Sequence, residues 1–398
     1  MHILISAVSS SRQPSGICRH AANLARSLTG RGEVSTITLL VGSWQMQYFT
    51  EAFGLNNSKL RLVSVDASHC AVARNIWYLR RLPLVAKEYR PDIIHLSFPV
   101  PFDPHRLNCP VVTSLHDLYP YDIPENFGLS RVLFNRMFLH QCLRCSMSVV
   151  CSSEFTLERL RAFVPNIAST KALRIYQSVE FGNVNHQKPT ILEINGRRFL
   201  LAVAQHRRNK NLGLLLKGFA GLRRRGGQWE EMALLIVGSS GPETGHLKRI
   251  VGQLSLQERV VFRAGVTDPE LSWLYANCEM LIAPSLIEGF GLPVVEALQC
   301  GAKVLCSDIP AFREVAANAA QYFDLCCSSP AKALADAAIV TCQESAKQPE
   351  GLDRFSAEAI ADQYVSLYSK LLATAQRCID EPQGSGVDRA IPDGVFPR

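Results

Sequence analysis

Short apolar segments alternate with amphipathic segments along most of the chain, and this alternation limits the folds open to it. In the first half the apolar segments lie at residues 2–8, 35–42, 60–66, 92–98, 110–117 and 147–153. Several are apolar throughout, which is typical of strands in a sheet covered on both faces. Between them, segments such as CRHAANLARSLTGRG have apolar residues at helical spacing. The order predicts an open, doubly wound parallel sheet.

The same pattern starts again in the second half, with apolar segments at 199–205, 232–238, 259–265, 280–285 and 302–308. We therefore expect an α/β protein with two Rossmann-like domains, 1–182 and 198–355, joined by a polar linker over 183–197. A helix over about 356–376 is expected to pack back toward the first domain, and residues 380–398 to be disordered. Ligands of such sheets bind at the carboxyl ends of the strands, so we expect the two domains to face each other across a ligand-binding cleft.

Hydropathy and cysteine content limit the compartment. No apolar run reaches the ~18 residues that a membrane-spanning helix needs, and the N-terminus lacks the positive region of a signal peptide. We expect a cytoplasmic protein, or one attached peripherally to the cytoplasmic face of the inner membrane. The 13 cysteines are scattered, which predicts reduced thiols. Cys142 and Cys145 form a lone C-x-x-C without a second ligand pair, so no metal site is expected.

The positive charge lies entirely in the first half. Residues 1–188 carry 20 Lys and Arg against 12 Asp and Glu, a net charge of +8, whereas the remaining residues carry 22 against 23. Such a basic surface attracts anionic lipid headgroups or polyphosphates, or it is solvated and has no partner. No RNA-binding signature accompanies it, so nucleic acid is not an expected partner.

The segment IEGFGLPVVEALQCG, residues 287–301, carries the most informative chemistry. It follows an apolar strand, Pro293 suits the first turn of a helix, and Gly301 suits its end. Glycines let the backbone approach a ligand, and we expect free N–H groups at 291–294 to suit phosphate or sugar oxygens. Glu288 and Glu296 are good acceptors for sugar hydroxyls; alternatively, Glu296 is a glutamate favoured by the helix dipole. The dinucleotide fingerprint G-x-G-x-x-G is missing after the first strand, which disfavours a dehydrogenase.

This segment, in PSLIEGFGLPVVEALQCG, resembles the E-x7-E signature of the retaining glycosyltransferase family 4, which has the GT-B fold. The resemblance continues through five further segments in the family's order and covers roughly residues 1–375. They are GVTDPELSWLYANCEMLIAPS, SDIPAFREV, AQHRRNKNLGLLLKGF, TSLHDLYPYDIPENF and PSGICRHAANLARSL. The L-H-D-L-Y-P and I-P-E-N-F segments resemble those of mannosyltransferase-like members.

The resemblance implies roles around the nucleotide-sugar donor. Glu288 would bind hydroxyls of the donor sugar, Glu296 the ribose hydroxyls, and Lys210 would neutralise the diphosphate. The backbone of the loop between the two glutamates would hold the sugar and diphosphate; its residues are Gly289, Phe290, Gly291, Leu292 and Pro293.

Other positions match the family less closely. An arginine usually stands five or six residues before the family lysine, but here Gln205 and Ala204 occupy those places. Arg207 or Arg208 would supply the missing charge, or they form a solvated basic turn. The base pocket would involve the backbone near Val266.

Two residues of the first half match family positions. Gly16 matches the glycine-rich first loop, which closes over the phosphates and acceptor. His116 matches the histidine at the donor sugar; without the resemblance it would be a structural histidine at a strand end.

The resemblance implies transfer with retention of anomeric configuration, without a cofactor or a required metal. The expected donor is GDP-mannose, with UDP-sugars as the alternative. The expected acceptor is a glycan, or a glycan linked to a polyprenyl diphosphate, in polysaccharide or O-antigen synthesis. The helix SRVLFNRMFLHQCLRC, with Arg131, Arg136 and Arg144, would touch an anionic membrane, or it is a core helix. The rival functions are a GT-B sugar-nucleotide epimerase and a non-catalytic scaffold of a polysaccharide complex.

Overall fold

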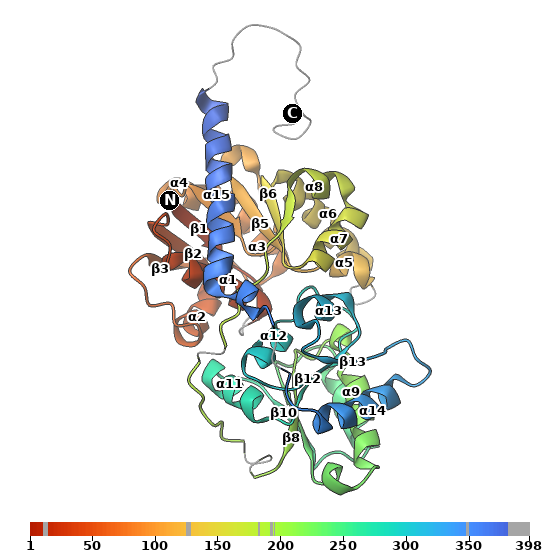
Figure 1. Ribbon diagram of the computed structural model, residues 1–398. Helices are drawn as coiled ribbons and strands as arrows, with labels where there is room; N and C mark the ends of the chain where they lie inside the picture. Colours follow the sequence, from red (N-terminus) through yellow and green to blue (C-terminus); the bar gives the residue numbers. More distant parts are fainter. Residues whose placement is uncertain are drawn as a thin grey trace. The chain divides into compact units, whose positions relative to one another are not determined.

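The computed structural model describes residues 1–10, 15–124, 129–181, 184–191, 194, 196–347 and 350–380, and it contains two compact units. The N-terminal unit comprises Met1–Ser152, Leu157–Ile175 and the chain from Ala357 onward. The C-terminal unit comprises Ser153–Thr156 and Tyr176–Ser356. Each unit has one parallel sheet with helices packed against it (Figure 1).

The N-terminal sheet has seven strands in the order β3-β2-β1-β4-β5-β6-β7. The strands are β1 His2–Ser6, β2 Thr36–Gly42, β3 Leu60–Val65, β4 Ile93–Leu96, β5 Val111–Leu115, β6 Ser148–Cys151 and β7 Ala172–Arg174. The helices are α1 Gly16–Thr29, α2 Met46–Ala52, α3 Ala71–Arg80, α4 Leu82–Tyr89, α5 Tyr119–Asp122, α6 Leu129–Cys145, α7 Glu154–Phe163, α8 Pro165–Lys171 and α15 Ala357–Asp380. Every residue of β4 and β5 is buried, as expected for strands covered on both faces.

Helix α15 packs along α1 in this unit (Figure 1). Tyr364 and Tyr368, one turn apart, are fully buried, while Arg31 pairs with the exposed Glu358 and Asp362 at the surface. The helix runs to Asp380 and is longer than the predicted 356–376. The prediction that disorder begins at residue 380 is therefore wrong at that residue, and residues 381–398 lie outside the described part.

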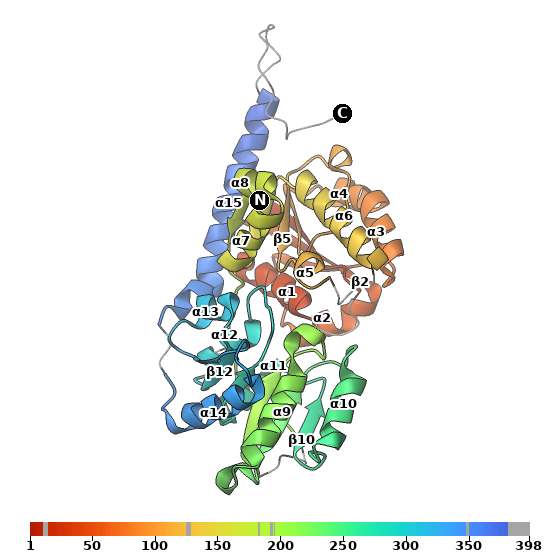
Figure 2. The ribbon, with the colours of Figure 1, turned by 90° about the vertical axis from the view of Figure 1, so that its right-hand side faces the viewer.

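The C-terminal sheet has six strands in the order β10-β9-β8-β11-β12-β13. The strands are β8 Phe199–Val203, β9 Ala233–Val237, β10 Val260–Arg263, β11 Leu281–Ala283, β12 Val304–Ser307 and β13 Gln321–Phe323. The helices are α9 Leu212–Arg223, α10 Thr244–Gln253, α11 Asp268–Asn277, α12 Leu292–Gln299, α13 Pro310–Ala316 and α14 Pro330–Gln343. Figure 2 shows α9 and α10 side by side.

Both sheets confirm the predicted doubly wound α/β architecture, and each predicted apolar segment contains a strand. The strands β7 and β13 lie at the sheet edges and were missed because each has three residues of which one is polar, ALR and QYF, so no apolar run marks them. Within the predicted linker, the described residues form no α-helix or strand.

Candidate functional site

The strand order of the C-terminal sheet reverses between β8 and β11, and ligands of doubly wound sheets bind where loops leave such a reversal in opposite directions. The loop after β8 carries Lys210, and the loop after β11 carries Glu288. The N–H of Leu286 donates to the carbonyl of Asn209 at 2.8 Å, which ties the two loops together. The sheet topology thus places two of the predicted donor-site residues at its ligand-binding edge.

Lys210 and Glu288 form an ion pair. The Lys210 ammonium lies 2.5 Å from Oε1 of Glu288, and the Ser285 hydroxyl donates to the same oxygen at 2.6 Å. Ser307 in turn donates to the carbonyl of Ser285 at 2.5 Å. Glu288 is only 7% exposed, so its charge needs these partners to offset lost hydration. The sequence predicted both residues at the donor but not their contact with each other.

Helix α12 begins as the sequence predicts, with Pro293 in the first turn and Gly301 in a left-handed conformation just beyond its end. Gly291 caps the start with φ of 101°, and a Cβ there would lie 2.8 Å from the ring of Phe312. The expectation of free N–H groups at 291–294 is partly wrong. Proline has no N–H, and Val294 donates to the carbonyl of Gly291 at 2.9 Å. Of these four positions, only Gly291 and Leu292 can offer an N–H to a ligand.

Glu296 lies inside α12 rather than in its first turn and is only 3% exposed. The Tyr275 hydroxyl, from α11, donates to its Oε2 at 2.8 Å. These observations contradict the alternative of a helix-start glutamate held by the dipole. A buried carboxylate oriented by a tyrosine has the geometry of a fixed hydrogen-bond acceptor.

Two hydroxyl groups that sequence reasoning missed hold the loop between the glutamates. Ser153 and Thr156 lie in the short segment that belongs to the C-terminal unit, and both are buried. Their hydroxyls donate to the carbonyl of Gly289 at 2.5 and 3.2 Å. The next residue, Phe290, is buried and its ring lies 5.5 Å from that of Phe355. The donor loop is thus anchored by both hydrogen bonds and packing.

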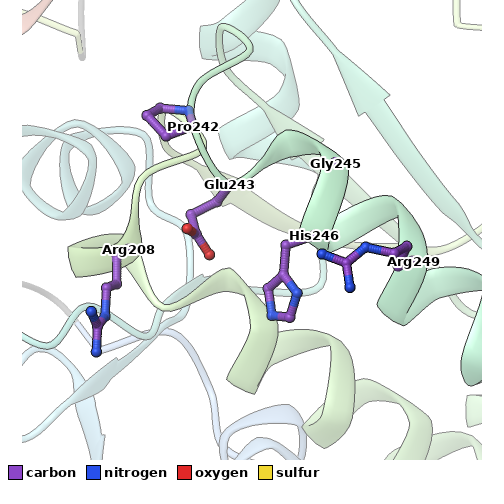
Figure 3. Close-up of a pocket in the computed structure, with 6 residues that line it drawn as sticks. All are labelled: Arg208, Pro242, Glu243, Gly245, His246 and Arg249. Carbon is purple, nitrogen blue, oxygen red and sulfur yellow. The ribbon is translucent and has the colours of Figure 1, made fainter.

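Arg207 and Arg208 are exposed, and Gln205 is half-buried. Arg208 lines a shallow pocket of about 620 Å³ together with Glu243, His246 and Arg249 (Figure 3). Arg207, Arg208 and Leu286 also line an adjoining pocket. Both arginines therefore stand beside the loop that carries Glu288, on a surface where basic groups predominate.

The predicted base-pocket residue Val266 precedes the start of α11 and is half-buried. Thr267 caps this helix, and its N–H donates to the Glu270 carboxylate at 2.9 Å. Thr267 and Glu270 thus form a capping box, in which each side chain bonds the backbone N–H of the other, and this fixes the backbone beside Val266.

In the N-terminal unit the strand order reverses between β1 and β4. Gly16 is the first residue of α1, in the connection after β1, and Ser15 caps the helix. His116 follows β5, and its Nε2 donates to the carbonyl of Ser97, after β4, at 2.8 Å. Both predicted residues thus lie at the carboxyl ends of the strands, His116 held by a residue from the reversal.

Two further histidines, His20 beside His116 and His95 on the other side of His20, were not singled out from the sequence. The ring of His20 lies 4.6 Å from that of His116, edge to face. Burial lowers the pKa of His116 to about 4 and that of His95 to about 3. The pKa of His20 lies well below its usual value because of burial and the neighbouring histidines. All three rings are therefore neutral at neutral pH.

Within the described residues, no group of histidines, cysteines and carboxylates is arranged to hold a metal ion. The cysteines of this part are free thiols, and Cys142 is a buried residue that contacts Thr113. None of the described helices is both long and apolar enough to cross a membrane.

Each half of the chain matches a known protein family. Residues 14–179 match Glycosyltransferase Family 4, and residues 184–352 match Glycosyl transferases group 1. The chain is 30% identical over 210 residues to an O-antigen chain mannosyltransferase of Salmonella typhimurium, covering 52% of this chain and 55% of that protein. It is 25% identical over 325 residues to O-antigen chain mannosyltransferase B of Escherichia coli, covering 76% and 81%. The match thus spans about half the length of the first relative and most of the second.

Solved structures show the same fold. Sucrose-phosphate synthase from Thermosynechococcus elongatus has a TM-score of 0.68 at 17% identity, over 94% of this chain and 99% of that one. WaaG, a glycosyltransferase involved in lipopolysaccharide biosynthesis, has a TM-score of 0.65 at 18% identity, over 96% and 100%. These likenesses confirm the predicted GT-B fold.

Proposed function

The chain belongs to the glycosyltransferases that combine a family 4 domain with a group 1 domain, and we propose that it transfers mannose from GDP-mannose to a hydroxyl group of a glycan. The names of its mannosyltransferase relatives support the choice of sugar. A UDP-sugar is the alternative donor. The proposed setting is cell-surface polysaccharide or O-antigen synthesis, with the acceptor glycan free or linked to a polyprenyl diphosphate.

The observation that carries this proposal is the Lys210–Glu288 pair at the strand-order reversal. A nucleotide sugar needs a cation for its diphosphate and an acceptor for its sugar hydroxyls, and the pair offers both within one contact. Glu296, eight residues further along the chain and fixed by Tyr275, is assigned to the ribose hydroxyls. Gly291 and Leu292 would offer their N–H groups to the diphosphate.

The proposed reaction breaks the bond between the anomeric carbon and the diphosphate oxygen and forms a bond from that carbon to the acceptor oxygen. The acceptor proton passes to the departing phosphate, and the anomeric configuration is retained. Negative charge grows on the diphosphate, and Lys210 stabilises it, with Arg207 or Arg208 beside the loop in place of the family arginine. No metal ion or other cofactor is required in this scheme. His116 and Gly16 are assigned to the donor sugar and to the phosphates and acceptor.

A lipid-linked acceptor implies contact with a membrane, and α6 offers a surface for it. The helix buries Leu139, Cys142 and Leu143, so it is a core helix on one face. On another face Leu133, Phe134 and Met137 are 70%, 56% and 51% exposed. Such exposed apolar side chains insert into the headgroup region of a bilayer.

The predicted arginines of α6 contribute unequally to this surface. Arg144 is exposed, whereas Arg136 donates to the Pro120 carbonyl at 2.9 Å and lies over the Tyr121 ring. The side chain of Arg131 lies outside the described part. We therefore assign membrane contact at the cytoplasmic face chiefly to the three apolar side chains.

A turnover screen of the purified chain tests the function. GDP-mannose, other GDP-sugars and UDP-sugars are offered with and without a lipid-linked glycan acceptor, and the anomeric configuration of the product is read by NMR. We expect transfer from GDP-mannose with retention. Transfer from a UDP-sugar alone would overturn the donor assignment, isomerisation without acceptor would indicate an epimerase, and absence of binding and turnover would indicate a scaffold.

A further inference from the structure

Four polar side chains form a continuous buried chain in the N-terminal unit. His20 Nε2 lies 3.0 Å from the Ser114 hydroxyl, and His95 Nε2 lies 2.8 Å from the same oxygen. On its other side, His95 Nδ1 lies 2.7 Å from the Tyr368 hydroxyl. The residues come from α1, β4, β5 and α15, so the chain joins four elements. All four are at most 4% exposed.

Proton counting shows how tightly this arrangement is specified. Ser114 has one hydroxyl proton and two neutral histidine nitrogens beside it. At most one histidine can therefore accept the proton of Ser114, so at least one of them donates its own Nε2 proton to the serine oxygen. An apolar residue at position 95 would remove the hydrogen bond of the buried Tyr368 hydroxyl, which costs about 1–3 kcal/mol, whereas one at position 20 would remove one of the two histidine partners of Ser114. The ring of His20 is thus held at a defined place and orientation.

His20 also touches the residue assigned to the donor sugar. Its ring meets that of His116 edge to face at 4.6 Å. A carbonyl only accepts, so the contact with Ser97 requires a proton on Nε2 of His116, and Nδ1 then presents a lone pair. His20 follows Gly16 by four residues on α1, which places both on the same side of the helix. The side chain of His20 therefore links α1 to the end of β5, where His116 lies.

We propose that His20 is a positioning residue, which its hydrogen bond to Ser114 anchors so that it fixes both the ring of His116 and the first turn of α1. The proposal rests on the proposed function, in which His116 and Gly16 serve the donor. His20 itself touches no substrate. Its effect on turnover comes from the orientation of His116.

Two substitutions of His20 distinguish the effect of its hydrogen bond to Ser114 from the effect of its aromatic ring. His20→Phe keeps an aromatic ring beside His116 but cannot bond Ser114, whereas His20→Gln can place an amide near the position of Nε2. We expect kcat of His20→Phe to fall at least tenfold with the donor KM changed less than threefold, and His20→Gln to recover most of the loss. Thr113→Val is the matched control. Thr113 lies next to Ser114 in β5, and its buried hydroxyl bonds Ser146 instead of a histidine. We expect this variant to keep the wild-type kcat.

Imidazole nitrogen NMR of the full chain at pH 7 gives a readout that does not depend on turnover. The His116 signal, identified by its loss in His116→Gln, is expected to show the Nε2-protonated tautomer in the wild type. In His20→Phe it is expected to broaden or to show a mixture of tautomers. An unchanged His116 signal together with wild-type kcat would overturn the proposal. If the wild type turns over no sugar nucleotide, the proposed function fails, while the tautomer comparison still decides whether His20 fixes His116.

Discussion

The ammonium of Lys210 lies 2.5 Å from Oε1 of Glu288, on an oxygen that also accepts a hydrogen bond from Ser285. The pair joins the loops after β8 and β11, and Glu288 is nearly buried. Because the cation and carboxylate are already in place, little reorganisation is needed when a diphosphate and a sugar arrive. Because each charge neutralises the other, removal of either side chain leaves the remaining charge without its ion-pair partner.

Substitution of Lys210 by Met is expected to lower kcat about 100-fold, the usual effect of removing one group that stabilises developing charge. It also leaves a nearly buried carboxylate without its cation, so we expect the free energy of unfolding to fall by about 1–3 kcal/mol. Steady-state kinetics and urea unfolding measure the two effects.

The double variant Lys210→Met/Glu288→Gln gives a sharper test of how the ion pair affects stability. A neutral side chain at 288 no longer needs a cation, so Lys210→Met should cost less stability there than in the wild type. Lys332→Met, at an exposed position of α14, serves as the control and should leave both quantities unchanged. Equal stability losses in both backgrounds would contradict the importance of the ion pair. Wild-type turnover of Glu288→Gln would contradict the role assigned to that carboxylate.

Tyr275→Phe removes the hydroxyl that orients Glu296 and preserves the packing of a fully buried ring. If Glu296 binds the ribose, the donor KM should rise about tenfold, or 1.4 kcal/mol, with kcat changed less than threefold. Tyr322→Phe is the control in the same unit, since its hydroxyl bonds the Ala317 carbonyl away from the donor loop. Equal donor KM values for wild type and Tyr275→Phe would remove Glu296 from the ribose site.

The strand, loop and helix around residues 281–299 could be predicted because local signals specify them. Pro293 and Gly301 mark the ends of α12 by their backbone preferences, and an apolar run marks β11. The roles expected for Glu288 and Lys210 came from the family resemblance and are still predictions. Their direct contact could not be predicted, because it depends on the strand order.

The residues that support the site could not be predicted for a physical reason. The hydroxyls of Ser153 and Thr156 reach Gly289 across more than 130 positions of sequence, and serines and threonines occur in many roles. His20 and His95 likewise stand at helix and strand positions where the sequence shows only isolated polar residues. Their significance depends on which elements the fold brings together.

Gly291→Ala is expected to destabilise the chain by about 2–4 kcal/mol. A Cβ disfavours the φ of 101° and would overlap the Phe312 ring at 2.8 Å. Gly301→Ala is a matched control at the other end of α12, with φ of 74° and no atom within 4 Å of the added Cβ. It should cost only about 1 kcal/mol. Equal losses of unfolding free energy in the two variants would mean that the Phe312 ring moves away from the added Cβ without an energetic penalty.

Replacement of Leu133, Phe134 and Met137 by Gln is expected to lower binding to anionic vesicles at least tenfold without loss of stability. The three side chains are exposed, so the fold does not depend on them, whereas each would bury apolar area in a bilayer. Co-sedimentation with phosphatidylglycerol vesicles measures the effect. Val340→Gln changes an exposed apolar residue of α14 and should bind as the wild type does. Undiminished binding by the triple variant would remove α6 from the membrane contact.

Acid should destabilise the chain before its carboxylates titrate, because the buried His20 and His95 and the half-buried His116 are held in the neutral form. Burial places the pKa of His116 at about 4, that of His95 at about 3 and that of His20 well below 6.5. The unfolded chain takes up protons below about pH 6.5 that the folded chain does not bind. The stabilisation from these residues is therefore complete above that pH and is lost as the pH falls. Below about pH 6, where the unfolded histidine is mostly protonated and the folded one is not, His95 and His116 each contribute a slope approaching about 1.4 kcal/mol per pH unit.

Urea unfolding at pH 7, 6 and 5 measures this slope. His95→Gln keeps hydrogen-bonding groups in place of the imidazole but has no titrating group, so between pH 6 and 5 its slope should be smaller by about 1.2 kcal/mol per pH unit. Equal slopes for the wild type and His95→Gln would mean that His95 binds its proton in the folded chain as readily as in the unfolded one.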